Sequence, residues 1–390
     1  MNGDVLFCGA WDEGPGYPRA TSLRQGLLAA GIDVRECRQP GLGRRKQRLL
    51  QAPWRWPTFW WQQRRRLASL IGDLRAACAD RRPRCVVVPY PGHSVVAAVK
   101  AACDVPVVLD LFLSAYDTVV EDRRLVHPGS LGALWLQHLD RAACAAADLV
   151  LLDTPANAAY VADLTGLPPE RFAWLPVHDP DPGTPAPLPA MASGPLQVLF
   201  FGTGVPLHGL AVLLDAVAEV RDVHLTLAGG ERALRDRARA HLGDRLTLEP
   251  EFVDSSRLRD LLAQCHLVAG VFGHGGKAQR VVPFKVVHAL AAGRPVVTAD
   301  TPAIDQWLAG LMKTARQQKW LAGSGACFGS PAGDARALAA LLDRLARDRA
   351  AVVRAAACAR PAYDRHFGTE RLATRWLDLL VRLAPTEVAA

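Results

Sequence analysis

Short apolar runs alternate with amphipathic stretches along the chain, and this pattern predicts strands that alternate with helices. The runs at 5–10, 85–89 and 149–152 contain almost no polar residue. Such runs are typical of parallel strands that are covered by helices on both faces. The stretches between them, such as 131–146, repeat apolar residues at helical spacing. The pattern therefore predicts an α/β fold with a doubly wound parallel sheet.

A proline-rich stretch at 178–195 divides this pattern into two halves. Prolines at this density exclude helix and strand alike, so the stretch is predicted to be a linker. The alternation restarts at Leu196, which predicts two doubly wound Rossmann-like lobes facing an interlobe cleft. The expected parts are an N-terminal lobe over 1–177, the linker, a C-terminal lobe over 196–360 and a last helix within 361–390 that crosses back to the N-terminal lobe.

Composition excludes several other classes of protein. Half of the 390 residues are hydrophobic and 22% are charged, which excludes a disordered or collagen-like chain. No run approaches the roughly 18 to 20 apolar residues of a spanning helix, and the start lacks a basic leader with a cleavage site. The nine cysteines form no C-x-x-C pair and are expected to be reduced thiols. We therefore expect a cytoplasmic protein.

Glycines and cations gather in loops that follow predicted strands of the second lobe. In open α/β sheets, ligands bind outside the carboxyl ends of the strands. The segment 199–209, LFFGTGVPLHG, has glycines that let the backbone approach a ligand, and 270–303 brings cations to the start of a helix. Cations placed together repel one another unless an anion lies between them, which favours a phosphate site. Ordinary glycine turns with cations in solvent are the alternative.

The same segments resemble a known family. FFGTGVPLHG, KAQRVVPFKVVHALAAGRPVVTADTPA and WDEGPGYPRATSLRQGL together are similar to the GT-B fold glycosyltransferases of the family-four, retaining type. The resemblance spans most of both lobes, and its strongest motif is PFKVVHALAAGRPVV. It implies an enzyme that moves a sugar from a nucleotide-diphosphate sugar to an acceptor hydroxyl. The N-terminal lobe would then bind the acceptor, such as a lipid-linked or cell-surface glycan precursor, and the C-terminal lobe the donor.

The resemblance also implies roles for single residues on the donor side. Lys285 is expected to contact the donor diphosphate. His288 stands where the family usually has a glutamate that contacts the ribose or the sugar, and His208 stands at its phosphate-binding lysine. The glycine loop after the first strand is expected to contact the sugar or the diphosphate. Its Arg19 is expected to lie in solvent, with phosphate binding as the alternative. The donor-binding candidates are Gly14, Gly16, Gly202, Thr203, Gly204, His208, Gly209, Lys277, Arg280, Lys285 and His288.

The chemistry needs the charge on the departing diphosphate to be neutralised. Fixed amides and cations supply this without a metal, each well-placed donor contributing about 3 kcal/mol. An Asp-x-Asp motif, which would indicate a metal, occurs at Asp179 and Asp181 in the linker and not after a strand. We therefore expect neither a metal nor a cofactor beyond the nucleotide-sugar co-substrate.

The N-terminal lobe is expected to present the acceptor. His93 and Asp110 follow two of its strands and are the candidates for orienting or deprotonating the acceptor hydroxyl. For each, a helix-cap or turn role is the alternative. The family often has a histidine where this chain has Phe112. The further acceptor-side candidates are Ser114, Tyr116 and Asp117.

The basic aromatic segment, residues 43–66, interleaves tryptophans with cations. Nine Lys or Arg and no acidic residue lie between Cys37 and Gly72. Tryptophan prefers the membrane interface and cations attract anionic lipid, so this segment is predicted to dock on the inner membrane face. The alternatives are tryptophans in the lobe's own core and, as the least favoured, single-stranded nucleic acid, so no nucleic-acid partner is expected. The membrane-contact candidates are Trp54, Trp56, Trp60, Trp61, Arg64, Arg65 and Arg66.

Two other functions fit the same sequence. One is a nucleotide-sugar epimerase of the same fold, and the other is a non-catalytic protein that binds nucleotide sugars or a membrane surface. The histidine at position 288 and the phenylalanine at 112 keep the second alternative open.

Overall fold

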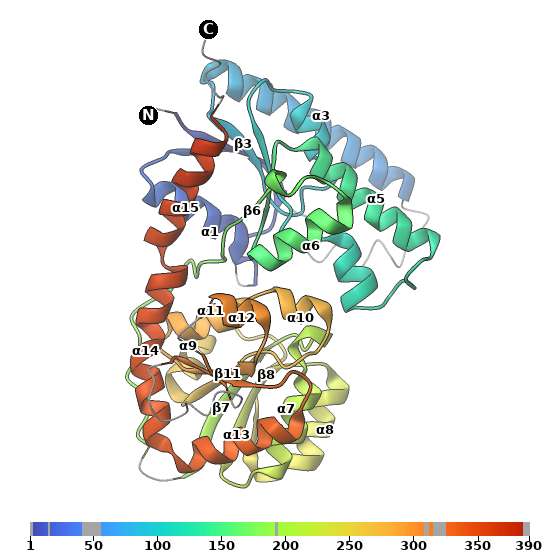
Figure 1. Ribbon diagram of the computed structural model, residues 1–390. Helices are drawn as coiled ribbons and strands as arrows, with labels where there is room; N and C mark the ends of the chain where they lie inside the picture. Colours follow the sequence, from blue (N-terminus) through green and yellow to red (C-terminus); the bar gives the residue numbers. More distant parts are fainter. Residues whose placement is uncertain are drawn as a thin grey trace. The chain divides into compact units, whose positions relative to one another are not determined.

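The computed structural model describes residues 3–14, 16–40, 56–191, 194–307, 312–314 and 325–384. The chain forms two compact units (Figure 1). The first unit comprises Met1–Val120, Leu125–Pro180 and Thr369–Ala390. The second comprises Glu121–Arg124 and Asp181–Gly368.

The first unit is built on a parallel sheet of six strands in the order β2-β1-β3-β4-β5-β6. All residues of β3, β4 and β5 are buried, because helices cover both faces of the sheet. Residue Cys8 of β1 is in register with Cys37 of β2, and Val5 of β1 with Cys85 of β3. The strands are β1 (Val5–Trp11), β2 (Val34–Pro40), β3 (Cys85–Val88), β4 (Val107–Asp110), β5 (Leu149–Leu152) and β6 (Phe172–Trp174).

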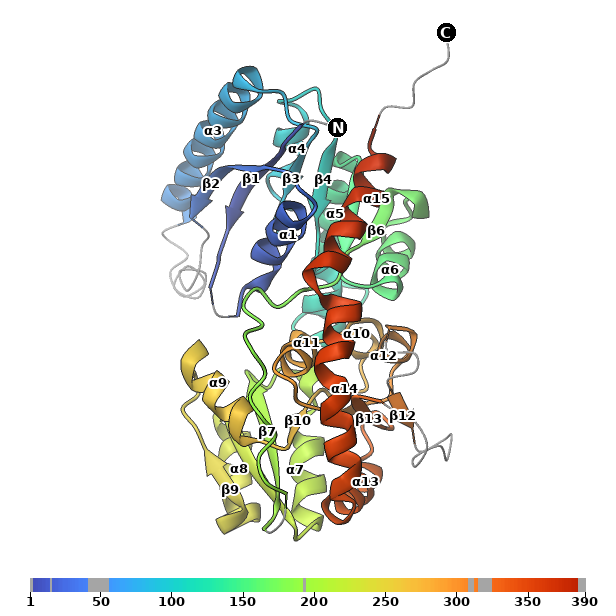
Figure 2. The same ribbon diagram turned by 90° about the vertical axis from the view of Figure 1, so that its left-hand side faces the viewer.

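Helices cover the two faces of this sheet with separate apolar cores. One core joins Phe7 of β1 to Leu23 of α1 and Trp376 of α15, whereas the other joins Leu6 of β1 to Leu74 of α3. The helices α1 and α15 lie side by side (Figure 2). The helices are α1 (Pro18–Ala29), α3 (Trp56–Asp80), α4 (Val96–Lys100), α5 (Leu131–Ala146), α6 (Pro155–Thr165) and α15 (Thr369–Arg382), with the π-helical turn η2 (Asp117–Asp122) and the 3-10 turn η3 (Pro169–Arg171).

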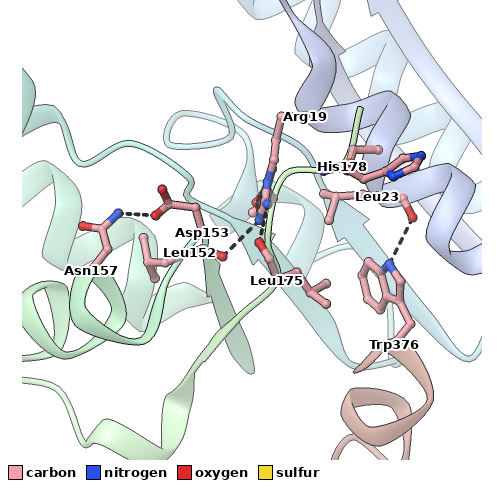
Figure 3. Close-up of polar contacts among 10 residues, drawn as sticks. Arg19, Leu23, Leu152, Asp153, Asn157, Leu175, His178 and Trp376 are labelled. Atoms are coloured by element: carbon pink, nitrogen blue, oxygen red, sulfur yellow. Dashed lines mark hydrogen bonds and ion pairs between the residues drawn. The ribbon is translucent and has the colours of Figure 1, made fainter. Parts of the chain in front are cut away.

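Close packing fixes α15 on α1 although more than 300 residues separate them in sequence. The indole Nε1 of Trp376 donates a hydrogen bond to the carbonyl oxygen of Leu23 at 3.0 Å (Figure 3). Gly26 makes this approach possible, because a Cβ there would lie 2.9 Å from atoms of both Leu372 and Trp376. The last helix therefore belongs to the core of the first unit.

The second unit is built on a parallel sheet of seven strands in the order β12-β13-β11-β10-β7-β8-β9. Its strands are β7 (Leu196–Gly202), β8 (Val223–Gly229), β9 (Leu246–Leu248), β10 (Leu267–Ala269), β11 (Val296–Ala299), β12 (Met312–Thr314) and β13 (Cys327–Ser330). Its helices are α7 (Leu210–Glu219), α8 (Arg232–Leu242), α9 (Ser255–Gln264), α10 (Gly276–Arg280), α11 (Phe284–Ala291), α12 (Pro302–Trp307), α13 (Ala335–Arg347) and α14 (Arg349–Phe367), with the 3-10 turns η4 (Pro206–His208) and η5 (Gly243–Arg245).

The end of the proline-rich stretch is held on the second unit by Arg294. This side chain is 1% exposed. Its guanidinium donates to the carbonyl oxygens of Ala186 and Pro187, each at 2.9 Å, and of Leu262 at 2.6 Å. The described residues of 178–195 form neither helix nor strand before β7 begins. Arg294 therefore supplies these backbone carbonyls with the hydrogen bonds that a neighbouring strand would supply in a sheet.

The predicted fold class, two doubly wound Rossmann-like lobes, is confirmed. The chain returns to the first unit at Thr369 rather than at residue 361. The helix α14 continues through Pro361 because the residues around it, Ala359 and Tyr363, are buried and hold the helix in place. Within the described residues, no helix has the length and apolar character needed to cross a bilayer.

Candidate functional site

The strand order places the candidate site of the second unit beside β7. The sheet is wound outward in both directions from β7 and β10, so the loops after these two strands flank the switch point at which α/β sheets bind ligands. Backbone hydrogen bonds join the two loops, from Phe272 to the carbonyl of His208 at 3.0 Å and from Gly273 to that of Leu207 at 3.2 Å. Gly209 has a φ of 59°, and a Cβ there would lie 2.5 Å from the backbone of Phe272. Only glycine fits this position.

Lys285 is the central side chain of this site. It lies in the first turn of α11, and its side chain is only 5% exposed. Its Nζ lies 3.8 Å from the ring centroid of Phe200 and makes no hydrogen bond within the described chain. Burial lowers the pKa of this amine well below its usual value. A buried amine without an anionic partner leaves a favourable position for an anion from outside the protein.

The glycine loop after β7 approaches this amine closely. A Cβ on Gly202, which has a φ of 129°, would lie 3.5 Å from the Nζ of Lys285 and 3.0 Å from the ring of His208. Gly204 also has a positive φ, of 79°, whereas the side chain of Thr203 between them is exposed. The backbone of Gly202–Gly204 and the amine therefore face the same small volume.

His208 stays neutral in this environment. Burial, and then the charge of Lys285, lower its pKa to about 3. Its Nδ1 accepts a hydrogen bond from the backbone amide of Gly204 at 3.2 Å, which places the proton of the neutral ring on Nε2. At the position of the family's phosphate-binding lysine, this chain therefore has a neutral ring whose Nε2–H is the donor.

The remaining donor-side candidates of the second unit lie on α10 and α11. The ring of His288 packs against Phe201 and Phe284, with centroids 5.9 and 5.6 Å apart. Lys277 is 6% exposed on α10. Arg280 forms an ion pair with Glu121 at 3.3 Å, so its charge is already balanced.

In the first unit, the strand order places the switch point between β1 and β3. The loop after β1 contains Gly14 and Gly16, both with positive φ, and a Cβ on either would contact nothing within 4 Å. These two candidates therefore lie in an open loop at the carboxyl edge of the sheet.

Arg19 and Asp110 form a buried ion pair at this edge. Arg19 is 4% exposed and Asp110 is fully buried, so the expectation of a solvated Arg19 is wrong. The Nε and Nη2 of Arg19 donate to Oδ1 of Asp110 at 3.0 and 2.8 Å. The guanidinium also donates to the carbonyls of Leu152 and Leu175, at 3.2 and 2.6 Å (Figure 3). Asp110 is thus engaged in holding the ends of β5 and β6, which favours its structural role.

His93 belongs to a second polar cluster, centred on Asp140 of α5. Asp140 is fully buried and accepts four hydrogen bonds, from His93 Nε2 at 3.0 Å, Ser114 Oγ at 2.6 Å and the amides of Ala115 and Tyr116 at 3.0 Å each. Burial raises the pKa of this carboxyl, but the hydrogen bonds from His93, Ser114 and the two amides outweigh it and lower the pKa. The ionised carboxylate accepts a hydrogen bond from Nε2 of His93, and in the neutral ring Nδ1 is then the acceptor.

The structure brings together several acceptor-side candidates around this cluster. Ser114 is bound directly, Tyr116 contributes its amide, and the amide of Asp117 donates to Ser114 Oγ at 2.9 Å. Asp140 was not identified from the sequence. The pattern that could have indicated it is an acidic residue on the apolar face of the amphipathic helix α5, three positions before the buried Ala143.

Phe112 lies beside the same edge, at the position where the family often has a histidine. Its φ is 53°, and the amide of Leu113 bonds the carbonyl of Leu111 at 2.5 Å across it, which is a strained tight turn. The ring packs edge to face on Tyr90 and lies 5.1 Å from the guanidinium carbon of Arg19. An apolar ring therefore covers the ion pair here.

The basic aromatic segment remains a prediction. Trp54 lies outside the described residues, and Trp56, Trp60 and Trp61 lie on α3 with side chains outside the described part. Arg64 and Arg65 are exposed and Arg66 is half-buried.

Two lobes of this topology, with a glycine loop and a buried amine at the strand switch point of the second, have the architecture of the GT-B fold. Comparison with known families agrees and makes the assignment specific. Residues 17–178 match the glycosyl transferase 4-like domain, and residues 195–348 match the glycosyl transferases of group 1. The chain belongs to this family of glycosyltransferases. No curated protein matches the sequence.

Solved structures agree on the fold. HepE of Anabaena, in complex with UDP, is 16% identical, with 97% of this chain and all of that one covered at a TM-score of 0.61. Sucrose-phosphate synthase of Thermosynechococcus elongatus is 16% identical, with coverage of 97% and 99% and a TM-score of 0.66. A glycosyltransferase of Rickettsia africae is 10% identical, with coverage of 99% and 100% and a TM-score of 0.63.

Proposed function

We propose that this glycosyltransferase transfers a sugar from a uridine-diphosphate sugar to an acceptor hydroxyl with retention of the anomeric configuration. Retention is the outcome implied by the family-four resemblance. The choice of uridine is supported by HepE, which has been solved with UDP and with UDP-glucose.

The donor diphosphate is placed on the second unit, and one observation carries this proposal. The Nζ of Lys285 is buried, has no hydrogen-bond partner in the described chain and faces the glycine loop after β7. A diphosphate there gains the ammonium charge, the amides of the loop and the Nε2–H of His208. The same groups stabilise the charge that develops as the diphosphate departs, each by about 3 kcal/mol. No metal is required by this arrangement.

The acceptor hydroxyl is placed at the carboxyl edge of the first sheet, near His93. The bond to Asp140 leaves Nδ1 of His93 to accept a hydrogen bond, so this nitrogen can orient the acceptor hydroxyl. We prefer His93 to Asp110 because Asp110 is fully buried against Arg19. A lipid-linked acceptor fits the basic aromatic segment, which we propose contacts an anionic membrane surface.

Calorimetry with UDP, GDP and TDP tests the donor site, and product analysis tests the reaction. We expect UDP to bind most tightly and a UDP-sugar to be turned over when an acceptor is supplied. The anomeric proton coupling of the product, measured by NMR, should match that of the donor sugar. Absence of binding by every nucleoside diphosphate would refute the donor site, and an inverted product would refute retention alone.

A further inference from the structure

Large apolar side chains are exposed together at the start of α5 and in the loop before it. Leu131 is 86% exposed, Leu125 71%, Trp135 61% and Leu134 54%. We call these four residues the α5 surface. Single exposed apolar residues are common, but four within eleven positions form a patch of the kind that marks an interaction site. The helix lies at the edge of its unit (Figure 1).

The helix itself shows that these side chains are not part of the core. Its other face packs into the first unit through Ala133, Ala143 and Cys144. Leu131 is four residues before Trp135 and three before Leu134, so these side chains lie on one side of the first turns. The outward face becomes polar further along, at His138 and Arg141. The apolar exposure is thus confined to the beginning of the helix.

The charges near the α5 surface indicate which kind of partner it binds. Exposed arginines lie directly before the surface, at Arg123 and Arg124, and after it, at Arg141; the acidic residues directly before it are Asp122 and Glu121, and Glu121 is paired with Arg280. A hollow of about 400 Å³ adjoins Leu134 and is bordered by His138 and Arg141, with Asp163 as the acidic residue on its rim. An exposed tryptophan and leucines beside these arginines fit the interface of an anionic bilayer, where apolar side chains are buried next to headgroup phosphates.

We propose that the α5 surface docks the first unit on an anionic phospholipid bilayer. Leu131, Leu134 and Trp135 enter the headgroup boundary, and the neighbouring cations contact lipid phosphates. This surface is separate from the basic aromatic segment in sequence, and vesicle binding by it requires neither donor nor sugar transfer.

Co-sedimentation of the full chain with vesicles tests this proposal. Vesicles of phosphatidylcholine mixed with phosphatidylglycerol are compared with phosphatidylcholine alone, for the wild type and for the double variant Leu131→Ser/Trp135→Ser. We expect the variant to lose at least about tenfold in partitioning to the anionic vesicles, since burial of each large side chain contributes well over a factor of five. Raising the salt concentration should weaken wild-type binding, because the cations contribute to it.

A matched control distinguishes binding through this surface from non-specific hydrophobic adsorption to the vesicles. Leu28 lies on α1 of the same unit and is 51% exposed, so Leu28→Ser removes an exposed leucine elsewhere. We expect it to bind vesicles like the wild type. Lipids with brominated acyl chains should quench tryptophan fluorescence in the wild type and quench it less in Trp135→Phe, which reports insertion directly.

Several outcomes would overturn the proposal. Unchanged vesicle binding by the double variant would do so, as would an equal loss in Leu28→Ser. Loss of binding only in a Trp60→Ala/Trp61→Ala variant would assign the membrane contact to the basic aromatic segment. Analytical ultracentrifugation tests a further outcome. If the wild type is dimeric, the double variant is monomeric and neither binds vesicles, the α5 surface is a contact between two copies of the chain. UDP affinity, measured without vesicles, should be the same for all these variants.

Discussion

Replacing Lys285 with methionine should move stability and nucleotide affinity in opposite directions. Methionine is nearly as long as lysine but carries no charge. In the free protein the buried amine of Lys285 has no hydrogen-bond partner in the described chain, and such a group destabilises a fold by about 1–3 kcal/mol. Removing it should therefore raise the midpoint of thermal unfolding by roughly 2–4 °C for each kcal/mol in a unit of this size.

The same substitution should weaken UDP binding strongly. The amine is already desolvated in the free protein, so most of its attraction to a diphosphate appears as binding free energy. Truncating one partner of a buried charge pair removes about 2–5 kcal/mol, which is roughly 30-fold to several thousand-fold in affinity. A bound diphosphate should also raise the pKa of Lys285, which burial lowers in the free protein.

Calorimetry and thermal unfolding, each with and without UDP, measure the two effects. Calorimetry in buffers of different ionisation enthalpy compares the protons exchanged on binding by the wild type and by Lys285→Met, and the difference between them is the contribution of this amine. Arg232→Met is the control, because its side chain is 91% exposed on α8 of the same unit and should change neither quantity. Wild-type UDP affinity in Lys285→Met, or a free variant less stable than the wild type, would refute the reasoning.

Three further predictions concern the other polar groups. His208→Gln should lose less stability than the wild type as the pH falls from about 6.5 to about 3. Because the pKa of His208 is depressed in the folded protein, the unfolded chain binds a proton in this range that the folded chain does not bind. Urea unfolding at several pH values between these limits measures the difference. Asp140→Asn should lower kcat more than the affinity for UDP and shift the pH profile of kcat, whereas a purely structural Asp140 would alter stability alone. Asp110→Asn and Arg19→Met should each destabilise the fold by about 3–5 kcal/mol, because each leaves one buried charge without its partner. The double variant Arg19→Met/Asp110→Leu should destabilise it by less than the sum of the two single effects, and denaturant unfolding measures all three.

Much of the fold was predictable because the information is local. Uninterrupted apolar runs such as 85–89 are typical of strands buried on both faces, and the described strands β3 and β11 are fully buried. Lys285 was predictable as well, because its position in the first turn after Pro283 depends on neighbours in sequence. Helix starts and strand ends need no knowledge of distant contacts.

The pairing of distant side chains was not predictable in the same way. Arg19 lies 91 residues from Asp110 and His93 lies 47 from Asp140, and no spacing rule relates such positions. The sequence shows Arg19 in a glycine-rich loop, where solvent exposure is the ordinary expectation. Burial of its guanidinium depends on the carbonyls at the ends of β5 and β6, which only the folded sheet brings together.

The histidine at position 208 explains how the donor site tolerates its buried amine. A lysine there would place a second ammonium group beside Nζ of Lys285, and two desolvated cations without an anion would repel one another in the free protein. Neutral His208 avoids this repulsion, and the amide of Gly204 fixes its proton on Nε2. The site therefore keeps a directed donor for phosphate while it carries a single buried charge, so its affinity should depend on Lys285 more steeply than in a relative with two cations.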